Sequence, residues 1–238
     1  MSPGEAQAPE NTPKTRRERV EQRENAIVAA AHDAFVDMGF EGARMADIAR
    51  AAKVAEGTLY LYFKNKNALL DAVVGRFYER LTEAAQDGVQ DRADTFACLE
   101  FLARHHLVSC IREWRILELV VSRYRNLQHY QDRGPYQLNR RYVAIFDSIV
   151  SLGMKRRDID PSLPLWMVRD LFYGTLEYAA RTQILRGEQA NIAIVIDSLM
   201  SMLRSGIAPG DQAAVESVDL EQISRRLEQV AARLENTT

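Results

Sequence analysis

The stretch that decides the fold runs from Ala55 to Leu70 and reads AEGTLYLYFKNKNALL. Its first half predicts a short helix from about Glu56 to Tyr62, followed directly by two lysines. The polar side chains that can face outward are Thr58, Tyr60, Tyr62, Lys64 and Lys66. Hydroxyls suit phosphate oxygens and base edges, and ammonium groups suit phosphates, so this segment has the features of a helix that enters a groove of DNA.

Two further helices are predicted before this stretch. Between Glu21 and Met38, apolar residues recur at helical spacing, and Gly39 follows as a helix-ending glycine. The small residues of 45–52 predict a second helix that packs closely, and 53–55 form a turn. Three short helices joined by turns of this length predict a helix-turn-helix unit whose last helix reads the major groove.

A known family shares this pattern of residues. The positions that carry the resemblance are Ile48, Ala49, Val54, Gly57, Thr58, Leu59, Tyr60, Tyr62, Phe63, Lys66, Leu69 and Leu70. In this combination the segment strongly resembles the TetR family of bacterial transcription regulators. The resemblance implies an all-α fold with an amino-terminal helix-turn-helix DNA-binding domain and a carboxy-terminal helical ligand-binding and dimerisation domain.

The resemblance also implies that Thr58, Tyr60, Tyr62 and Lys66 contact DNA. The burial preference of large apolar residues instead places Leu59 and Phe63 in the core. Together with residues whose chemistry suits phosphate, the predicted DNA-binding set is Arg44, Lys53, Gly57, Thr58, Tyr60, Tyr62, Lys64 and Lys66.

The sequence departs from the family pattern at three places. Lys53 replaces the usual glycine of the turn, so a positive φ there would cost about 1 kcal/mol while the lysine adds a phosphate ligand. Ala55 stands where Ser or Thr caps the recognition helix, which predicts an uncapped start. Arg44 and Met45 replace the threonine-type start of the second helix.

The rest of the chain predicts helix after helix, without strand alternation of useful length. The expected ranges are 67–85, 92–110, 113–128, 135–154, 163–186 and 189–205. The expected domains are a disordered basic arm (1–20), the DNA-binding domain (21–66), an effector-binding and dimerisation domain (67–206) and a linker with an amphipathic helix (207–238). The arm can equally be a first helical turn, and the last helix can pair across a dimer or lie against its own domain.

The last two helices of the second domain carry more apolar residues than one face needs, which in this family implies a homodimer through a four-helix bundle. The predicted interface is Trp166, Gly174, Ala179, Ile192, Ile196, Leu199 and Leu203. The candidate effector pocket is Phe101, His105, Trp114, Leu117, Val121, Tyr124, Phe146, Phe172, Tyr173 and Glu177, with ordinary core packing as the alternative for each residue. Similarity of Asp170–Tyr178 to acyl-CoA-responsive members of the family suggests a fatty acyl-CoA or another hydrophobic effector.

Composition sets the remaining limits. A net charge of −2 argues against a protein that coats nucleic acid through bulk positive charge. Neither a signal peptide nor a membrane span is expected, so we expect a cytoplasmic protein. The spacing of Cys98, His105, His106 and Cys110 does not match a structural zinc site, and the chain shows no catalytic motif, so neither metal, cofactor nor enzyme activity is expected.

The function expected from these observations is a repressor that a small apolar or amphipathic effector releases from a palindromic operator. The alternative is a helical protein that binds DNA or organises chromosomes without an effector.

Overall fold

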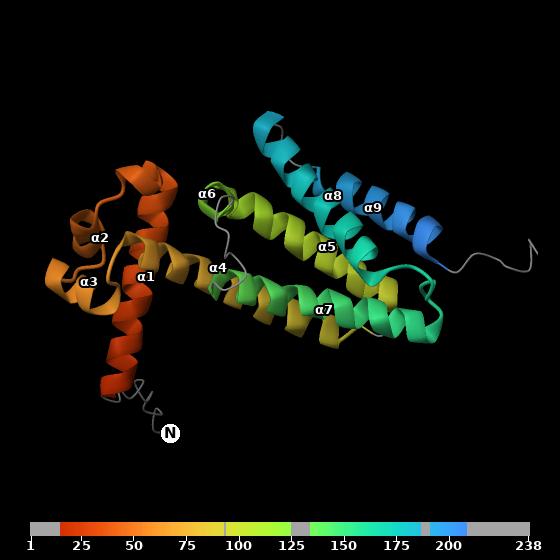
Figure 1. Cartoon of the computed structure of the whole chain (residues 1–238), viewed down its shortest axis with the longest axis horizontal. Helices are drawn as coiled ribbons and strands as arrows, with labels where there is room; N and C mark the ends of the chain where they lie inside the picture. The colour runs from red at the N-terminus through yellow and green to blue at the C-terminus, as the bar shows by residue number, and fades with distance from the viewer. Residues whose placement is uncertain (1–14, 93, 125–133, 187–190, 209–238) are drawn as a thin grey trace, which may run out of the picture.

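The computed structural model describes residues 15–92, 94–124, 134–186 and 191–208, and throughout these ranges the secondary structure is helical. The helices are α1 (Arg16–Gly42), α2 (Met45–Ala51), α3 (Glu56–Tyr62), α4 (Lys66–Gln90), α5 (Thr95–Arg112), α6 (Trp114–Tyr124), α7 (Gly134–Arg156), α8 (Leu165–Arg186) and α9 (Ile192–Ile207). The prediction of an all-α fold in two parts is confirmed (Figure 1). No helix in the described part is long and apolar enough to cross a membrane.

Helix α1 begins earlier than its apolar pattern predicts because a capping box fixes its start. The Thr15 hydroxyl accepts a hydrogen bond from the Glu18 amide at 3.2 Å, and the Glu18 carboxylate accepts one from the Thr15 amide at 2.7 Å. Residues 16–20, expected in a disordered arm, are therefore helical. At the other end Gly39 takes φ 69°, which confirms it as the break in the helix.

The first hydrophobic core belongs to the reading head, by which we mean α1, α2, α3 and the first turns of α4. Its fully buried members include Ile27, Phe35, Ile48, Leu59 and Leu69. Phe63 is also buried there, so the placement of Leu59 and Phe63 in the core is confirmed. Ile116 and Val120 reach this core from α6, which lies far along the chain.

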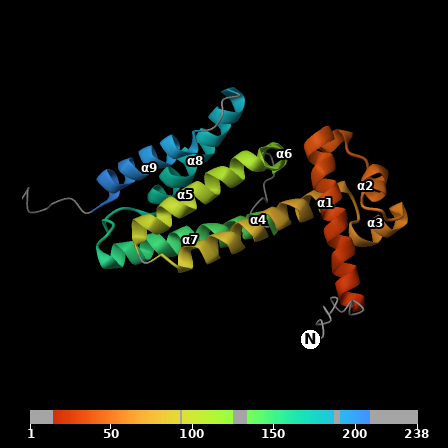
Figure 2. The ribbon, with the colours of Figure 1, turned by 180° about the vertical axis from the view of Figure 1, so that it is seen from behind.

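The second core lies between α4, α5, α7, α8 and α9, with α5 packed against each of the other four helices. Figure 1 and Figure 2 both show α4 and α7 side by side along one side of α5, with α8 and α9 on the other. Helix α4 contributes Leu70 and Val73 to the first core and Phe77 and Leu81 to the second. The two cores are therefore joined by a continuous helix, which extends to Gln90 rather than ending near residue 85.

The other predicted helix boundaries agree with the structure to within a few residues. The predicted end of the sixth helix at 128 and the carboxy-terminal amphipathic helix lie outside the described residues.

Candidate DNA-binding and effector sites

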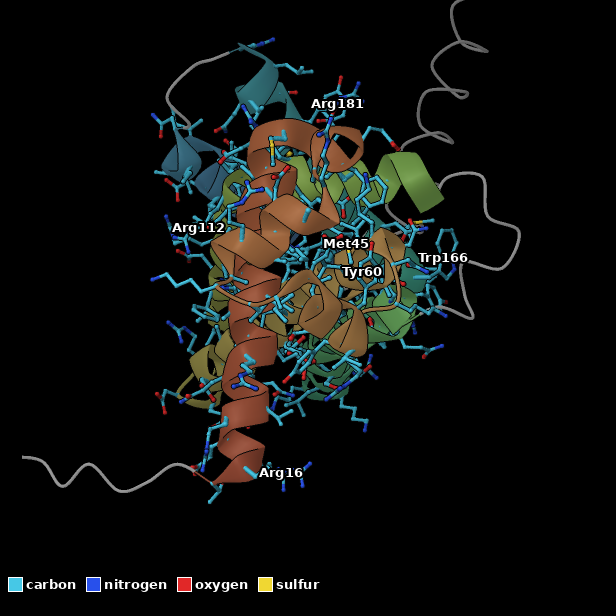
Figure 3. All side chains as sticks on the ribbon, turned by 90° about the vertical axis from the view of Figure 1, so that its left-hand side faces the viewer. Arg16, Met45, Tyr60, Arg112, Trp166 and Arg181 are labelled. Atoms are coloured by element: carbon cyan, nitrogen blue, oxygen red, sulfur yellow. The ribbon has the colours of Figure 1, made fainter. Side chains whose placement is uncertain are left out.

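The exposed face of α3 carries the first candidate site. Leu59 anchors the helix in the core, and this leaves Tyr60 48% exposed and Leu61 86% exposed. Figure 3, viewed from the head end, shows Tyr60 on the outer surface, away from the second core. Leu61 was missed by the sequence analysis, because a leucine in a helical pattern is assumed to face inward.

The backbone at the start of α3 is open to an approaching partner. Gly57 is exposed, and a Cβ added there would meet no atom within 4 Å. Ala55 makes no side-chain cap, so the free N–H groups of the first turn are not satisfied by a capping side chain. The predicted uncapped start is confirmed, and no packing contact within the described chain requires a glycine at position 57.

Basic side chains flank this helix. Lys53 is exposed in the turn and takes φ 56°, so the left-handed conformation considered for this position is present with a lysine in it. Arg44 is exposed at the start of α2, and Lys64 is exposed just after α3. All three cations are solvent-exposed, and their contacts with phosphates stay predictions.

Lys66 and Tyr62 are more enclosed than their predicted role suggests. The Lys66 ammonium donates hydrogen bonds to the carbonyl oxygens of Glu41 at 3.3 Å and Ala43 at 3.1 Å. It also lies 4.5 Å from the centre of the Phe40 ring. Tyr62 is half-buried and packs against the first core. Lys66 thus ties the start of α4 to the end of α1, and its phosphate contact stays a prediction.

A polar link joins the reading head to the second core. His32 on α1 is 2.7 Å from the carboxylate of Glu113, at the end of α5, and 3.1 Å from that of Asp33. Desolvation alone lowers the pKa of His32, but the hydrogen bonds and charges of Glu113 and Asp33 raise it above the ordinary value of 6.5. The Arg115 guanidinium donates a hydrogen bond of 2.7 Å to the Val36 carbonyl, which holds α6 against α1.

A cavity of about 470 Å³ opens between α5, α7 and α8. Its lining residues are His106, Tyr136, Asn139, Arg140, Tyr142, Val143, Arg169, Asp170, Tyr173, Gly174 and Glu177. This volume is within the usual range for sites that hold small molecules. The cavity is therefore the candidate effector site.

Buried polar side chains form the floor of this cavity. His106 is joined to Cys110 by a hydrogen bond of 3.4 Å and to the Tyr142 hydroxyl by one of 3.3 Å. Burial lowers the pKa of His106 to about 3 and raises the pKa of the Cys110 thiol to about 12. Burial likewise raises the pKa of both tyrosines, so every group of the floor is uncharged near pH 7.

The hydroxyl of Tyr173 is also buried and lies near the Tyr142 hydroxyl. Burial raises the pKa of Tyr173, and a hydrogen bond with Tyr142 partly offsets that rise.

Charged groups at the rim largely cancel one another. Arg169 makes a two-point ion pair with Asp147, with both N–O distances at 2.8 Å. Arg140 stands at the mouth together with the carboxylates of Asp170 and Glu177. Although Glu177 is exposed as a residue, desolvation raises the pKa of its carboxyl. The rim therefore has no excess of positive charge for a buried anion.

Only two of the ten predicted pocket residues, Tyr173 and Glu177, line this cavity. Phe146 and Phe172 are fully buried behind Tyr173, and Val121 is 56% exposed. Phe101 packs on Gly88 and stacks on His105, whose ring nitrogen contacts the Leu81 carbonyl at 3.0 Å. Trp114 and Leu117 are half-buried on α6, outside the cavity lining. The side chain of Tyr124 lies outside the described part of the chain.

The predicted dimer residues divide into two groups. Ile196, Leu199 and Leu203 are at most 3% exposed and belong to the protomer's own second core, so their assignment to an interface was wrong. Trp166 and Gly174 are exposed, whereas Ala179 and Ile192 are half-buried. Large apolar side chains that remain exposed on α8 and α9 form what we call the apolar stripe: Trp166, Met167, Leu171, Tyr178, Leu185, Ile194 and Met202. Figure 3 shows Trp166 on the outside of the molecule.

Two other arrangements do not form sites. A hollow of about 530 Å³ on the reading head, between α1 and α2, is lined largely by alanines together with Asp33, Asp37 and Asp47, and no buried unpaired polar atom faces it. Within the described ranges no three His, Cys, Asp or Glu side chains come together as a metal site would require.

Comparisons with known proteins agree with this geometry. Residues 27–73 match the family described as bacterial regulatory proteins, tetR family. The fatty acid metabolism regulator protein of Bacillus subtilis is 26% identical over 187 residues, which are 76% of this chain and 93% of the relative. The transcriptional repressor KstR2 of Rhodococcus jostii is 23% identical over 201 residues, which are 78% of this chain and 91% of the relative.

Solved structures share the fold. The FadR regulator of Bacillus subtilis in complex with stearoyl-CoA superposes with a TM-score of 0.66 and 23% identity, over 77% of this chain and 98% of that one. FadR of Bacillus halodurans gives a TM-score of 0.66 and 20% identity, over 82% and 98% of the two chains. At these identities the likeness establishes the fold.

Proposed function

Because the chain is a DNA-binding transcriptional regulator of the TetR family, we propose that it is a homodimeric repressor released from a palindromic operator by a small amphipathic effector. The observation that carries this proposal is the continuity of α4, which begins in the reading head and packs along α7 beside the cavity. A ligand that displaces α7 therefore has a direct mechanical path to the head.

DNA recognition is assigned to the exposed face of α3 and its basic flanks. We assign Tyr60, Leu61 and the half-buried Thr58 to the base edges, and the apolar Leu61 side chain suits the methyl group of thymine. Arg44, Lys53 and Lys64 contact phosphates, and the open backbone at Gly57 allows the close approach of one. Lys66 positions the start of α4 and offers its remaining donor to DNA.

Dimerisation is assigned to the apolar stripe. Met167, Leu171, Gly174 and Tyr178 are separated by four, three and four residues along α8, and Leu185 follows seven residues after Tyr178, as on one face of a bundle helix. The absence of a side chain at Gly174, where an added Cβ meets nothing within 4 Å, leaves room for a second helix. Two copies joined by this surface would present two reading heads to two half-sites.

An acyl-CoA is the proposed effector class. The relative with 26% identity is named a fatty acid metabolism regulator, and a structural neighbour holds stearoyl-CoA. The cavity between α5, α7 and α8 supplies the site.

The test begins with selection of DNA ligands from a random pool by the purified full chain. We expect a palindromic consensus, and fluorescence anisotropy should show that stearoyl-CoA releases the selected duplex from the protein. Selection of many unrelated sequences, together with binding that no acyl-CoA changes, would instead support an effector-independent DNA-binding protein.

A further inference from the structure

We infer that the first turns of α1 form a second DNA contact of the reading head, in which Arg16, Arg19 and Arg23 bind phosphates of the duplex that α3 reads. This contact fixes the position of the head on the duplex and is independent of base sequence. The inference rests on the DNA-binding function proposed for the reading head and does not depend on the effector.

The first argument is that the beginning of α1 is exposed on every side. All residues of 16–26 are exposed, and the first buried side chain of the helix is Ile27. Figure 1 and Figure 2 both show these turns extending beyond α2 and α3, and Figure 3 shows Arg16 at the outer end of α1. A helical segment that buries no apolar face gains no stability from packing. The extension is therefore a surface that remains open to a partner.

The second argument is that three arginines lie on the side of α1 that faces α2. Alternating spacings of three and four residues place one line of side chains along this side of the helix: Arg16, Arg19, Arg23, Ala26, Ala30, Asp33 and Asp37. The last four line the hollow between α1 and α2, and Lys53 lines it from the other side. The basic stripe, by which we mean Arg16, Arg19 and Arg23, therefore shares a side of the head with a lysine assigned to phosphates.

The third argument is that the acidic residues of the extension lie away from the basic stripe. A second line, at alternating spacings of four and three, runs along the core side of the helix: Arg17, Glu21, Glu24, Val28, Ala31 and Phe35. The Glu18 carboxylate is engaged in the capping box with the Thr15 amide. The side that faces α2 becomes acidic only at Asp33 and Asp37, so we place phosphates along its first two turns.

The position and length of the basic stripe also suit a DNA backbone. Arg16 lies in the first turn of α1, where the helix dipole disfavours a cation, so this charge does not serve the stability of the helix. The seven residue steps from Arg16 to Arg23 cover about 10 Å along the helix. Phosphates of one DNA strand follow at about 3.4 Å along the duplex axis. The guanidinium groups can therefore contact several successive phosphates, each through two hydrogen bonds.

The experiment measures how salt changes the DNA affinity of the full chain. Fluorescence anisotropy gives this affinity between about 50 and 200 mM salt, for the selected palindrome and for an unrelated duplex of equal length. Arg23→Gln should reduce the salt dependence by about one ion per protomer, and Arg16→Gln combined with Arg23→Gln by about two. Both duplexes should be weakened by similar factors, because phosphates carry no sequence information.

Arg17→Gln is the matched control for Arg23→Gln. It removes the same charge from the same exposed segment, but on the core side of the helix, and should leave the salt dependence unchanged. The inference is refuted if the double variant keeps the wild-type salt dependence. It is also refuted if Arg17→Gln lowers that dependence as much as Arg23→Gln does, since net charge alone would then explain the loss.

A charge-conserving variant distinguishes a phosphate contact from a structural role. Arg16→Lys combined with Arg23→Lys should keep the salt dependence of the wild type, because lysine supplies the same charge. The glutamine and lysine variants should all melt as the wild type does, since the replaced side chains are exposed. Loss of salt dependence in the lysine variant would overturn the inference.

DNA release by stearoyl-CoA separates this inference from the proposed function. If stearoyl-CoA releases the wild type and the double glutamine variant, and both show one salt dependence, the repressor proposal stands and the role of the basic stripe is refuted. If the double variant shows the reduced salt dependence but stearoyl-CoA releases neither protein, the inference stands and the proposed effector fails.

Discussion

Lys53 and Gly57 both carry a conformational cost within the isolated chain. A side chain in the left-handed region destabilises a residue by about 1–2 kcal/mol, and a glycine within a helix destabilises it by about 1 kcal/mol relative to alanine. Lys53 has φ 56°, and no packing contact requires a glycine at position 57. Both residues flank the face of α3 assigned to DNA. We therefore propose that binding to phosphates offsets these two conformational costs.

Lys53→Gly tests this account because it should change stability and affinity in opposite directions. Relief of the left-handed lysine should raise the melting temperature by about 2–4 °C, while loss of the cation should weaken DNA binding and reduce the salt dependence by about one ion per protomer. Thermal denaturation and salt titrations of DNA affinity give the two values.

Arg157→Gly is the matched control for Lys53→Gly. Arg157 has φ 65° after α7, far along the chain from the reading head. The Arg157→Gly substitution should raise the melting temperature in the same way and leave DNA binding unchanged. A Lys53→Gly protein with wild-type affinity and wild-type salt dependence would show that Lys53 touches no phosphate.

At the scale of the elements, three helices meet at Glu113. Its carboxylate accepts from His32 of α1 at 2.7 Å and lies 3.9 Å from Arg80 of α4. Glu113 is also the residue that ends α5 and precedes α6. The relative position of α1, α4 and α5 is therefore fixed by one largely buried carboxylate.

The raised pKa of His32 makes this link depend on pH. Because the folded pKa lies above the unfolded value of 6.5, the ion pair contributes fully below that value and is lost as pH rises through the folded pKa. Glu113→Gln should therefore lower the free energy of unfolding more at pH 5.5 than at pH 8, by on the order of 1 kcal/mol. Urea denaturation at the two pH values measures this difference.

Asp33→Asn serves as the comparison for Glu113→Gln. The Asp33 side chain is 77% exposed, so water screens its interaction with His32 and its pH-dependent effect should be smaller. An equal loss for Glu113→Gln at pH 5.5 and pH 8 would show that His32 carries no charge in this link.

For the whole molecule, the apolar stripe determines the assembly that we propose. Leu171 is 52% exposed at its middle, and no described part of the chain covers it. Exposed apolar surface of this extent on two neighbouring helices indicates an interaction site.

Leu171→Glu should therefore produce a monomer. A carboxylate buried against its symmetry copy would be desolvated without a partner, and each half-site would then be bound independently. Sedimentation should give the mass of a single chain, and affinity for the selected palindrome should fall by at least about a hundredfold. Leu152→Glu is the control, since this leucine is 45% exposed on α7 outside the stripe and should leave the dimer intact. A dimeric Leu171→Glu protein would place the interface elsewhere.

Local patterns were sufficient to predict the reading head and the all-α fold. Helical spacing, the helix break at Gly39 and the short turn at Lys53 are determined by residues close together in the sequence, so the sequence predicts them. The residues of the dimer interface could not be predicted from local sequence, because an apolar helix such as α9 has two apolar faces. Periodicity does not show that Ile196 packs inward while Ile194 is 62% exposed.

The cavity depends on contacts between distant segments, which explains why most of its residues were not predicted. Its floor, for example, is formed where His106 of α5 bonds to Tyr142 of α7, and the two residues are 36 positions apart in the sequence. Leu61 illustrates the same limit, since only the burial of Leu59 shows which side of α3 is left outside.

The reading head is not a module that can be exchanged by cutting the chain after residue 66. Ile116 and Val120 complete its core from α6, and Leu69, Leu70, Val73 and Val74 do so from α4. A chimaera that joins residues 1–66 to the effector domain of another regulator would inherit foreign side chains at all six positions. Recombination of DNA specificity with effector specificity in this architecture therefore requires these six residues to be transplanted along with α1, α2 and α3.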